Sequence, residues 1–344
     1  MKQKVIFILT TYNDGGIEKV FDIVAKSLIN KDIEVYLFVI GSKIKKQPSK
    51  VHLINKFIDL WKLKQESYVI NFSSDWKSSL LSALLSKHYV SWIHCNPCTM
   101  KTAKTHILNF GLLRKSKRII CVCEEQKNIL ITEYGFNNKI DVIYNCIDEE
   151  QIINMVNEKV NFDFKYIVMP ARFDLGSKDF NTLLKAYSDL DSKIKEEYKL
   201  VLLGDGEDRK KISELIKKYE IENFIFMPGY SNNPYKWMKN AEIVLLISKT
   251  EGFPLTTIEA MFCETPLIIS KFHTGAQEIS DNGKNCVVVP VGNSQALSGA
   301  ISNLIMDSNL RERYVRNAKK YINKFSQAEF EKKINILFEE LLYE

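Results

Sequence analysis

Two glutamates, Glu251 and Glu259, are separated by seven residues in a stretch with strong secondary-structure signals. The short run Ile243–Ile247 before them is rich in β-branched residues and predicts a buried strand. Thr256-x-x-Glu259 is the pattern of a capping box and predicts the start of a helix. Because the N–H groups of a helix N-terminus bind anions, acids on either side of that start predict a site for a diphosphate-containing ligand. Each acid alone also has a structural interpretation, Glu259 as a capping partner and Glu251 as a solvated loop residue.

The residues around both acids, EGFPLTTIEAMFCETP, resemble the retaining nucleotide-sugar glycosyltransferases of family 4, whose signature is Glu-x7-Glu. The resemblance implies that Glu259 accepts hydrogen bonds from the ribose hydroxyls of the donor. It also implies that Glu251 is catalytic and orients a sugar hydroxyl near the reacting carbon. Glu264 departs from the family, which usually has glycine at this helix-to-strand turn. The donor-lining residues carried over from the same stretch are Phe253, Pro254, Leu255 and Thr256.

A second candidate site lies upstream, where two cations, Arg172 and Lys178, follow the end of an expected strand. Cations at a strand end suit a diphosphate, although ordinary surface charge is the alternative for either one alone. The passage resembles the family's G-R-L/F-x-x-x-K with one extra residue, which implies catalytic contacts to the departing diphosphate. The loop 226–235, with Met227 and Tyr230, resembles the loop that holds the base in this family. Its Asn-Pro-Tyr is most similar to bacterial polysaccharide enzymes that use UDP-sugars.

The N-terminal half carries weaker motifs. Gly15 and Gly16 stand where a strand and loop lead into a helix, and bare backbone there can approach a ligand closely or pack a helix tightly on a strand. Together with Glu18 they match the G-G-x-E that family 4 enzymes carry near the donor phosphates. His94 ends a strand, where open parallel sheets bind ligands, and the family often has a catalytic His there. A lone His is more often structural.

Strand and helix patterns alternate along the whole chain, which predicts an α/β protein with Rossmann-like units. The resemblance implies the GT-B fold, in which two such domains face each other across a cleft and the C-terminal helix crosses back to the N-terminal domain. The predicted domains are an acceptor domain at 1–161, completed by the helix 325–344, and a nucleotide-sugar donor domain at 162–324. The expected strands are 5–9, 34–40, 67–72, 89–93, 118–122, 141–144, 165–169, 200–203, 224–227, 243–247, 267–269 and 286–289.

Composition places the chain among globular proteins, with 45% apolar and 26% charged residues in 344. The N-terminus lacks a small-residue cleavage site, and no apolar run approaches the ~20 residues of a membrane span. We therefore expect a cytoplasmic protein. Seven cysteines are an odd count in a long chain, which favours thiols over a disulfide framework. Their spacing does not fit a zinc site.

The formal charge of +6 is uneven. Residues 1–150 hold 22 Lys+Arg against 15 Asp+Glu, so the rest of the chain is close to neutral. The windows Val35–Ile58 and Trp76–Cys123 contain no acid. We expect either a solvated basic face or a face that binds an anionic partner. The hypothesis for that partner is the inner face of the cell membrane, to which the protein would bind peripherally. The basic residues chosen for that surface are Lys101, Lys104, Arg114, Lys115, Lys117 and Arg118.

Metal dependence is not expected. Asp189-Leu-Asp191 is a formal Asp-x-Asp, a motif that holds a divalent cation in GT-A enzymes, but it joins two helical patterns, where capping is favoured. Arg172 and Lys178 would supply the positive charge. No cofactor beyond the UDP-sugar substrate is predicted.

The resulting hypothesis is a retaining glycosyltransferase that transfers a hexose or N-acetylhexosamine from a UDP-sugar to a hydroxyl of a lipid-linked glycan, in the synthesis of cell-surface polysaccharide. One alternative is a GT-B sugar phosphorylase or a nucleotide-sugar epimerase, since both also need cationic contacts to phosphate. The other is a non-enzymatic, basic nucleic-acid-binding protein. The chain lacks a recognisable nucleic-acid module, and its second half is nearly neutral, which disfavours this reading.

Overall fold

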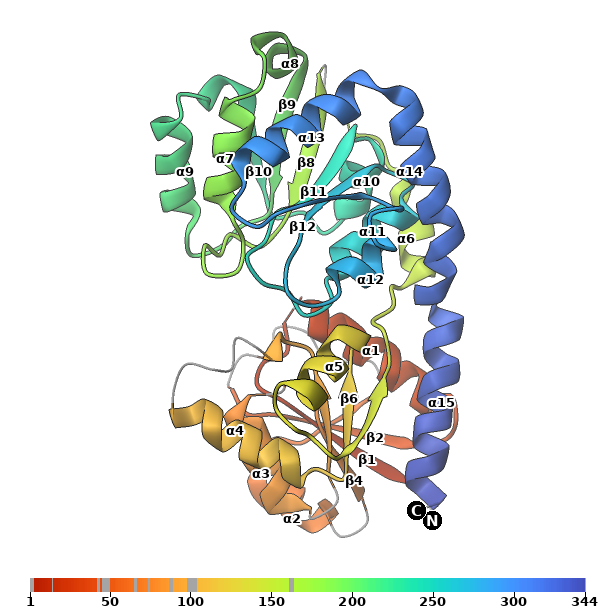
Figure 1. The fold of residues 1–344 in the computed structure, drawn as a ribbon. Coiled ribbons are helices and arrows are strands. Elements are labelled where there is room, and N and C mark those ends of the chain that lie inside the picture. The colour runs from red at the N-terminus through yellow and green to blue at the C-terminus, as the bar shows by residue number, and fades with distance from the viewer. Residues whose placement is uncertain are drawn as a thin grey trace. The chain divides into compact units, whose positions relative to one another are not determined.

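The computed structural model describes residues 3–13, 15–41, 44, 50–64, 67–73, 75–86, 89–97, 104–160 and 164–343, without the side chains of 104–107, 109, 342 and 343. It divides into two compact units, the first Met1–Ile147 with Gln327–Glu344 and the second Asp148–Ser326 (Figure 1). The boundary predicted at 161/162 lies outside the described residues. The second unit begins earlier because its first helix, α6 (Glu149–Val156), packs on α10 (Pro234–Lys239). Asn233 Nδ2 donates to the Met155 carbonyl at 2.8 Å across that contact.

The first unit is a parallel sheet in the order β3-β2-β1-β4-β5-β6-β7. Its central strands are buried on both faces, which is why they are apolar without alternation. The sequence missed β3, which has only two residues. The strands are β1 (Lys4–Leu9), β2 (Glu34–Val39), β3 (His52–Leu53), β4 (Ser67–Asn71), β5 (Val90–Ile93), β6 (Arg118–Cys121) and β7 (Lys139–Val142). The helices are α1 (Gly16–Ile29), α2 (Phe57–Leu63), α3 (Trp76–Leu85), α4 (Lys104–Lys115), α5 (Glu124–Thr132) and α15 (Gln327–Tyr343).

The C-terminal helix α15 is part of the first unit, although it follows the second in the chain. Phe330, Ile334 and Phe338 are buried, and the Phe330 ring lies 6.3 Å from that of Trp92. Arg118 is only 4% exposed, and it pairs with Asp141 and with Glu340, the latter at 2.7 Å. Arg118 therefore holds α15 in place. The prediction that Arg118 belongs to the basic residues facing a membrane is wrong.

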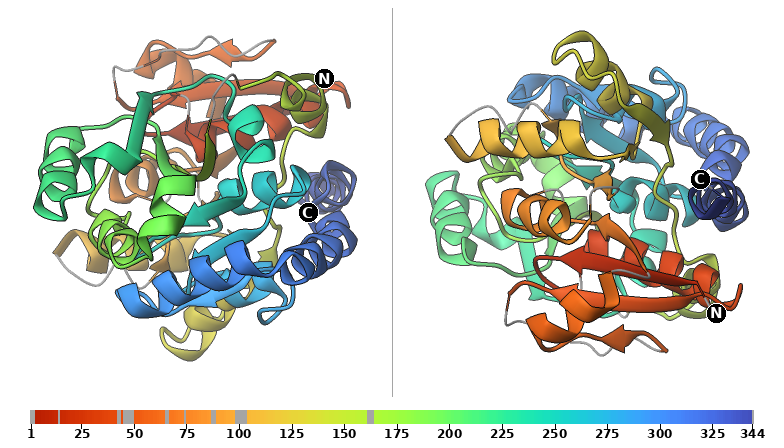
Figure 2. Two further views of the ribbon diagram at one scale, coloured as in Figure 1. Left: turned by 90° about the horizontal axis from the view of Figure 1, so that it is seen from above. Right: turned by 90° about the horizontal axis from the view of Figure 1, so that it is seen from below.

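The second unit is a parallel sheet in the order β10-β9-β8-β11-β12-β13. Helices α7, α9 and α13 pack on one face, and α10 and α11 cover the other (Figure 2). The strands are β8 (Lys165–Pro170), β9 (Tyr198–Leu203), β10 (Ile225–Gly229), β11 (Ile243–Leu246), β12 (Leu267–Ser270) and β13 (Val287–Val289). The remaining helices are α7 (Phe180–Ser188), α8 (Ser192–Glu197), α9 (Arg209–Lys218), α11 (Leu255–Phe262), α12 (Ala276–Ser280), α13 (Ser294–Met306) and α14 (Ser308–Tyr321), with 3-10 turns Glu222–Phe224 and Ile322–Phe325.

The turn after α11 forms without the glycine usual in the family. Glu264 adopts the left-handed conformation with φ of 57°. The Thr265 N–H donates to the Ala260 carbonyl at 3.2 Å and the Glu264 N–H to the Met261 carbonyl at 3.1 Å, which is a Schellman closure. The Glu264 carboxylate pairs with Lys319 at 2.6 Å. The unusual residue thus leaves the path from α11 into β12 intact.

None of the helices formed by the described residues is both long and apolar enough to cross a membrane.

Candidate functional site

The predicted donor residues follow the carboxyl ends of neighbouring strands in the second unit. Arg172 and Lys178 follow β8, and Glu251 follows β11, which pairs with β8 in parallel. The strand order reverses between these two strands, because β9 and β10 lie to one side and β12 and β13 to the other. Open α/β sheets bind ligands in the crevice outside such a switch point. The structure therefore brings these two loops to the place where a ligand is expected.

A network of short contacts ties the Glu251 carboxylate to the β8 loop. Lys178 Nζ pairs with Glu251 Oε1, and both side chains are largely covered. Ser248 Oγ donates to the same Glu251 oxygen at 2.7 Å and lies 3.4 Å from Lys178 Nζ. Because one carboxylate oxygen meets both groups, its position is fixed by the ends of β8 and β11 together.

The backbone around Glu251 is fastened from two sides. The Asp179 N–H donates to the Ile247 carbonyl at 2.9 Å, which joins the β8 loop to the end of β11. On the other side, Thr274 Oγ1 donates to the Glu251 carbonyl at 2.5 Å and lies 3.1 Å from the Gly252 carbonyl. Sequence reasoning missed Ser248 and Thr274, because single hydroxyl residues in loops carry no spacing signal.

Helix α11 begins two residues earlier than the capping box at Thr256 predicts, and the capping box is absent. Pro254 precedes the first helical residue, Leu255, and no side chain caps the N-terminus. Pro254 is itself the N-cap residue, with an extended backbone, and its carbonyl accepts from the Thr257 N–H at 3.3 Å. Thr256 is consequently inside the first turn, and the Thr257 hydroxyl donates to the Pro254 carbonyl at 2.6 Å. The first-turn N–H groups of a helix have no intrahelical acceptor, so Leu255 and Thr256 offer donors to an anion.

Glu259 lies on the buried side of α11 and is 5% exposed. The hydroxyl of Tyr235, on α10, lies 3.4 Å from Glu259 Oε1. Phe253 is also buried, and its ring packs edge-on against Phe325 at 5.4 Å. Pro254 and Leu255 are buried as well, so their side chains pack inside the unit while their backbone forms the turn into α11. Tyr235 is a further contact that sequence reasoning did not identify.

Three other predicted residues stand apart from this network. Arg172 is 78% exposed and meets only the carboxylate of Asp174, at 3.4 Å, among the described contacts. Met227 is half-buried in β10, and its carbonyl accepts from Arg209 at 3.3 Å. Tyr230 is exposed beyond the end of β10. The structure therefore joins Lys178 to Glu251 but does not bring Arg172 into contact with either.

The Gly204-x-Gly206 pair serves backbone packing. A Cβ on Gly204 would lie 2.0 Å from the Ala171 carbonyl oxygen, and one on Gly206 would lie 2.4 Å from the Phe173 carbonyl oxygen. The Phe173 N–H in turn donates to the Asp205 carbonyl at 3.0 Å. The glycines let the loop after β9 lie directly on the loop that carries Arg172.

We expect Gly204→Ala to lower the free energy of unfolding by roughly 2 kcal/mol or more, because a left-handed residue costs about 1–2 kcal/mol and the backbone clash adds to it. Urea unfolding of the purified protein measures this change. Gly283→Ala is the matched control, since Gly283 has a positive φ of 84° but open space around its added Cβ. Equal losses in the two variants would contradict the packing role.

In the first unit, the Gly15-Gly16 turn is organised by Glu18. Gly15 is extended and precedes α1, and Thr11 Oγ1 lies 3.2 Å from a Glu18 carboxylate oxygen that also accepts from the Asn13 N–H at 3.3 Å. A Cβ on Gly15 would lie 2.3 Å from the other Glu18 oxygen. The G-G-x-E motif is therefore a loop that its own glutamate closes, and the absence of a side chain at Gly15 leaves room for that carboxylate.

His94 lies just beyond β5 and is buried against aromatic rings. Its ring is 4.5 Å from that of Phe72 and stacks on Trp92 at 5.8 Å. Burial lowers the pKa of His94 to about 3, so the imidazole is neutral at physiological pH. Within the described residues neither ring nitrogen has a hydrogen-bond partner. A neutral imidazole offers one donor and one acceptor to a ligand hydroxyl.

The two acids of the Asp-x-Asp at 189–191 lie at helix ends, Asp189 at the end of α7 and Asp191 at the start of α8. Asp191 accepts from the Lys193 N–H at 2.8 Å at the start of α8, and Asp189 pairs with Lys185 at 2.5 Å at the end of α7. No cluster of three or more His, Cys, Asp or Glu side chains suited to a metal occurs among the residues that the structure describes. Cys98 lies outside those residues, and the other six cysteines form no disulfide in the described structure. Metal independence stays a prediction.

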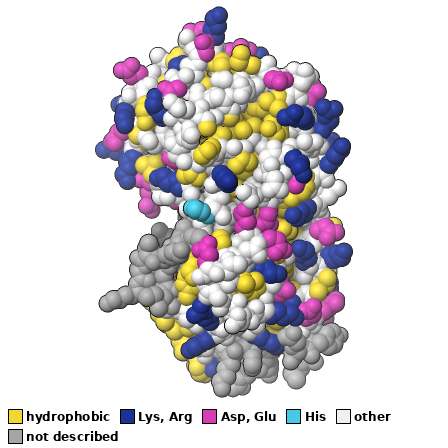
Figure 3. Space-filling view, viewed as in Figure 1, with side chains coloured by type: hydrophobic (Ala, Val, Ile, Leu, Met, Phe, Trp, Pro, Cys, Tyr) yellow, Lys and Arg dark blue, Asp and Glu magenta, His cyan; other side chains and the backbone are white. Residues whose placement is uncertain are grey.

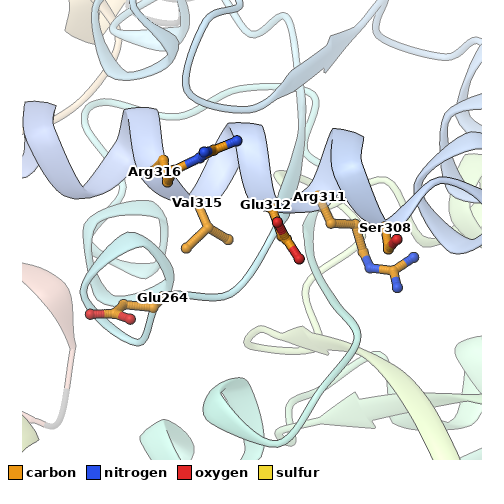
Figure 4. Close-up of a pocket in the computed structure, with 6 residues that line it drawn as sticks. All are labelled: Glu264, Ser308, Arg311, Glu312, Val315 and Arg316. Carbon is orange, nitrogen blue, oxygen red and sulfur yellow. The ribbon is translucent and has the colours of Figure 1, made fainter.

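The surface of the second unit also carries a hollow outside the candidate site. Basic and acidic side chains are interspersed over the second unit in Figure 3, in keeping with its near-neutral charge. A hollow of about 370 Å³ lies along α14, lined by Arg311, Glu312, Arg316 and Glu264 among others (Figure 4). It includes none of the predicted donor residues. Because it is open and carries charges of both signs, we assign it no ligand.

Comparison with known proteins places both halves of the chain. Residues 14–151 match the model described as Glycosyltransferase Family 4, and residues 150–321 match the model described as Glycosyl transferases group 1. A Campylobacter jejuni relative, "N-acetylgalactosamine-N,N'-diacetylbacillosaminyl-diphospho-undecaprenol 4-alpha-N-acetylgalactosaminyltransferase", is 30% identical over 53% of this chain and 48% of that protein. The chain thus spans about half the length of that relative.

Two further comparisons extend over nearly the whole chain. The amylovoran biosynthesis glycosyltransferase AmsD of Erwinia amylovora is 24% identical over 92% of this chain and 94% of its own. The crystal structure of Anabaena Alr3699/HepE in complex with UDP and glucose superposes with a TM-score of 0.83, at 18% identity, over 98% of this chain and 100% of that one. At that identity the likeness concerns the fold alone. The family and fold predicted from the Glu-x7-Glu stretch are confirmed: the chain belongs to the group 1 glycosyl transferases of family 4 and is a glycosyltransferase with the GT-B fold.

Proposed function

We propose that this glycosyltransferase transfers a hexose or N-acetylhexosamine from a UDP-sugar, with retention of anomeric configuration, to a hydroxyl of a lipid-linked glycan in polysaccharide synthesis. The observation that carries the proposal is the pair of acids around the start of α11. Glu251 is fixed by Lys178 and Ser248 before the helix, and Glu259 is buried within it. Between them lie the N–H groups of the first turn of α11, which follows β11 at the switch point of the sheet.

The printed names of similar proteins support the choice of substrates. The Anabaena structure holds UDP and glucose, and the Campylobacter relative is named for an undecaprenol-linked acceptor. AmsD is named for amylovoran biosynthesis. We take from these a uridine nucleotide as donor and a growing glycan on a lipid diphosphate as acceptor.

In the proposed reaction, the bond between the anomeric carbon and the diphosphate oxygen breaks, and the acceptor oxygen bonds to that carbon from the same face. The acceptor proton passes to the departing diphosphate. Lys178 and the N–H groups of Leu255 and Thr256 stabilise the developing negative charge. Arg172 adds an exposed cation beyond the end of the neighbouring strand β8.

The two acids have separate roles in this scheme. Glu259 would accept hydrogen bonds from the ribose hydroxyls, with Tyr235 holding its carboxylate. Glu251 would accept from a sugar hydroxyl near the reacting carbon. Lys178 and Ser248 both engage one Glu251 oxygen, which leaves the second oxygen to define the sugar's orientation. Neutral His94 would contribute a hydrogen bond to a substrate hydroxyl.

The test is to incubate the protein with a panel of UDP- and GDP-sugars and a polyprenyl-diphosphate glycan, and to measure nucleotide release and the anomer formed. We expect UDP release that depends on the acceptor, and a product with the anomeric configuration of the donor. Release of GDP alone, or an inverted product, would contradict the proposal. A free sugar 1-phosphate would indicate the phosphorylase alternative, and an epimerised nucleotide sugar would indicate the epimerase.

We predict that transfer persists in EDTA at a rate within about twofold of the untreated enzyme. The physical reason is that Lys178 and the α11 N-terminus already supply positive potential to a diphosphate. Initial rates with EDTA, and after added Mn²⁺ or Mg²⁺, measure the effect. Loss of transfer in EDTA that manganese restores would refute metal independence.

A further inference from the structure

Helix α2, in the first unit, presents large apolar side chains to solvent. Phe57, Ile58 and Trp61 are 52%, 55% and 45% exposed. The helix is anchored from its opposite side, where Leu60 is fully buried and Leu63 is half-buried in a cluster shared with α3. The three exposed residues therefore form an outward apolar face on a helix whose other side is already packed.

The outward face is ordered. Phe57 and Trp61 are one helical turn apart, and their rings stack at 6.3 Å with an interplanar angle of 29°. Lys64 Nζ lies 3.0 Å from the centre of the Trp61 ring. Cation–π contact keeps this ammonium group beside the aromatic face. The apolar face thus ends in a positive charge at its C-terminal side.

Positive charge surrounds the same helix. Lys56 precedes Phe57 and Lys62 follows Trp61, and both are exposed. Asp59 is the only acid within α2, and the 24 residues that end at Ile58 contain none. Aromatic side chains with flanking lysines are what membrane interfaces select, since the rings enter the headgroup region and the ammonium groups meet lipid phosphates. A second copy of this face would bring like charges together.

We propose that α2 is a docking site for an anionic phospholipid bilayer, in which Phe57, Ile58 and Trp61 enter the headgroup region and Lys56, Lys62 and Lys64 contact lipid phosphates. The inference rests on the proposed function only in that a lipid-linked acceptor requires the enzyme at a membrane. At seven residues and about 1.5 Å per residue the helix is far too short to span, so it lies in the interface. This surface would therefore bind both by inserting apolar side chains and by attracting lipid phosphates to its lysines.

The position of α2 separates it from the candidate site. Ser67 Oγ, at the start of β4, donates to the Leu63 carbonyl at the end of α2 at 2.7 Å. Gly15 and His94 follow the carboxyl ends of β1 and β5, which is the opposite edge of this parallel sheet. Substitutions on α2 can therefore remove lipid binding without touching residues assigned to catalysis.

The experiment is co-sedimentation with vesicles of phosphatidylglycerol and phosphatidylcholine. We expect the wild type to pellet at 0.1 M salt and to keep part of its binding at 1 M, because apolar contacts are not screened. Phe57→Ser/Trp61→Ser should lower partitioning ~10–100-fold, given that about half of each ring is available for burial. The matched control is Ile131→Ser/Ile336→Ser, which removes equally exposed apolar side chains from α5 and α15 and should bind as the wild type does.

Fluorescence gives an independent reading, since Trp92 and Trp237 are buried and Trp61 is the most exposed tryptophan of the described structure. Vesicles should shift the emission to shorter wavelength in the wild type and in Trp76→Phe, but not in Trp61→Phe. Failure of the wild type to pellet, unchanged binding by the double variant, or dimerisation that the double variant abolishes would each overturn the proposal. UDP release with a soluble acceptor should be unaffected by the double variant, so a failed donor assay with intact vesicle binding would count against the proposed function alone.

Discussion

Glu251→Gln is expected to lower the rate of sugar transfer by roughly 10²–10³-fold, the range for losing one preorganised electrostatic contact in a transition state. The substitution keeps the side-chain shape but removes the charge that Lys178 and Ser248 fix in place. UDP affinity should change much less, because the proposed role of Glu251 concerns the sugar near the reacting carbon. Steady-state kinetics with the preferred UDP-sugar, together with calorimetric titration of UDP, measures the two effects separately.

The matched control for this prediction is Glu264→Gln. Glu264 also pairs with a lysine of the same unit, Lys319, at 2.6 Å. It has no proposed role in donor binding or catalysis. It should retain wild-type turnover. If Glu251→Gln keeps turnover within a few-fold of the wild type in folded protein, or weakens UDP binding as much as turnover, the catalytic assignment of Glu251 fails.

Glu259→Ala is expected to weaken UDP binding by about 1.5–3 kcal/mol, which is the value of a hydrogen bond to a charged group. The carboxylate is 5% exposed, so solvent screens its contact with a ribose hydroxyl only weakly. Turnover at saturating donor should fall less than affinity, since the ribose is far from the bond that breaks. Calorimetry with UDP, and with uracil as a ligand that lacks ribose, reports the loss.

Two variants separate binding from folding for Glu259. Tyr235→Phe removes the hydroxyl that lies 3.4 Å from Glu259 and should reproduce a smaller part of the loss. Glu259→Gln keeps an acceptor oxygen and should fall between the wild type and the alanine variant. A thermal midpoint close to that of the wild type shows that the alanine variant is folded. Unchanged UDP affinity in such a protein would exclude the ribose contact.

Much of the fold could be predicted because parallel strands that are buried on both faces appear in the sequence as short apolar runs. The run 243–247 and strand β11 differ by one residue, and most other strands begin or end within two residues of their prediction. β7 was placed too late, at 141–144, because its first residues Lys139 and Ile140 do not read as an apolar run. The predicted capping box is absent because the N-cap residue is Pro254, which has no side-chain acceptor, and Thr256 lies inside the first turn.

The contacts that organise the site could not be read from spacing. Ser248 and Thr274 contact Glu251, and Tyr235 contacts Glu259, each through a single hydroxyl group. These contacts form only after β8, β11 and α10 are assembled. Arg118 shows the same limit for charge. It stands in a window without acids, yet its partner Glu340 is 222 residues further along the chain. Local composition therefore counted one buried arginine as part of the basic surface of the first unit.

The return of α15 to the first unit sets an order of assembly during synthesis. The second unit is one continuous segment, Asp148–Ser326, and all of its strands precede α15 in the chain. The first unit is discontinuous and lacks the side chains that cover Trp92 and Arg118 until residues 327–344 emerge. Domains fold as units once their chain is complete, so the second unit finishes first. The sheet of the first unit is therefore completed only when α15 packs against it.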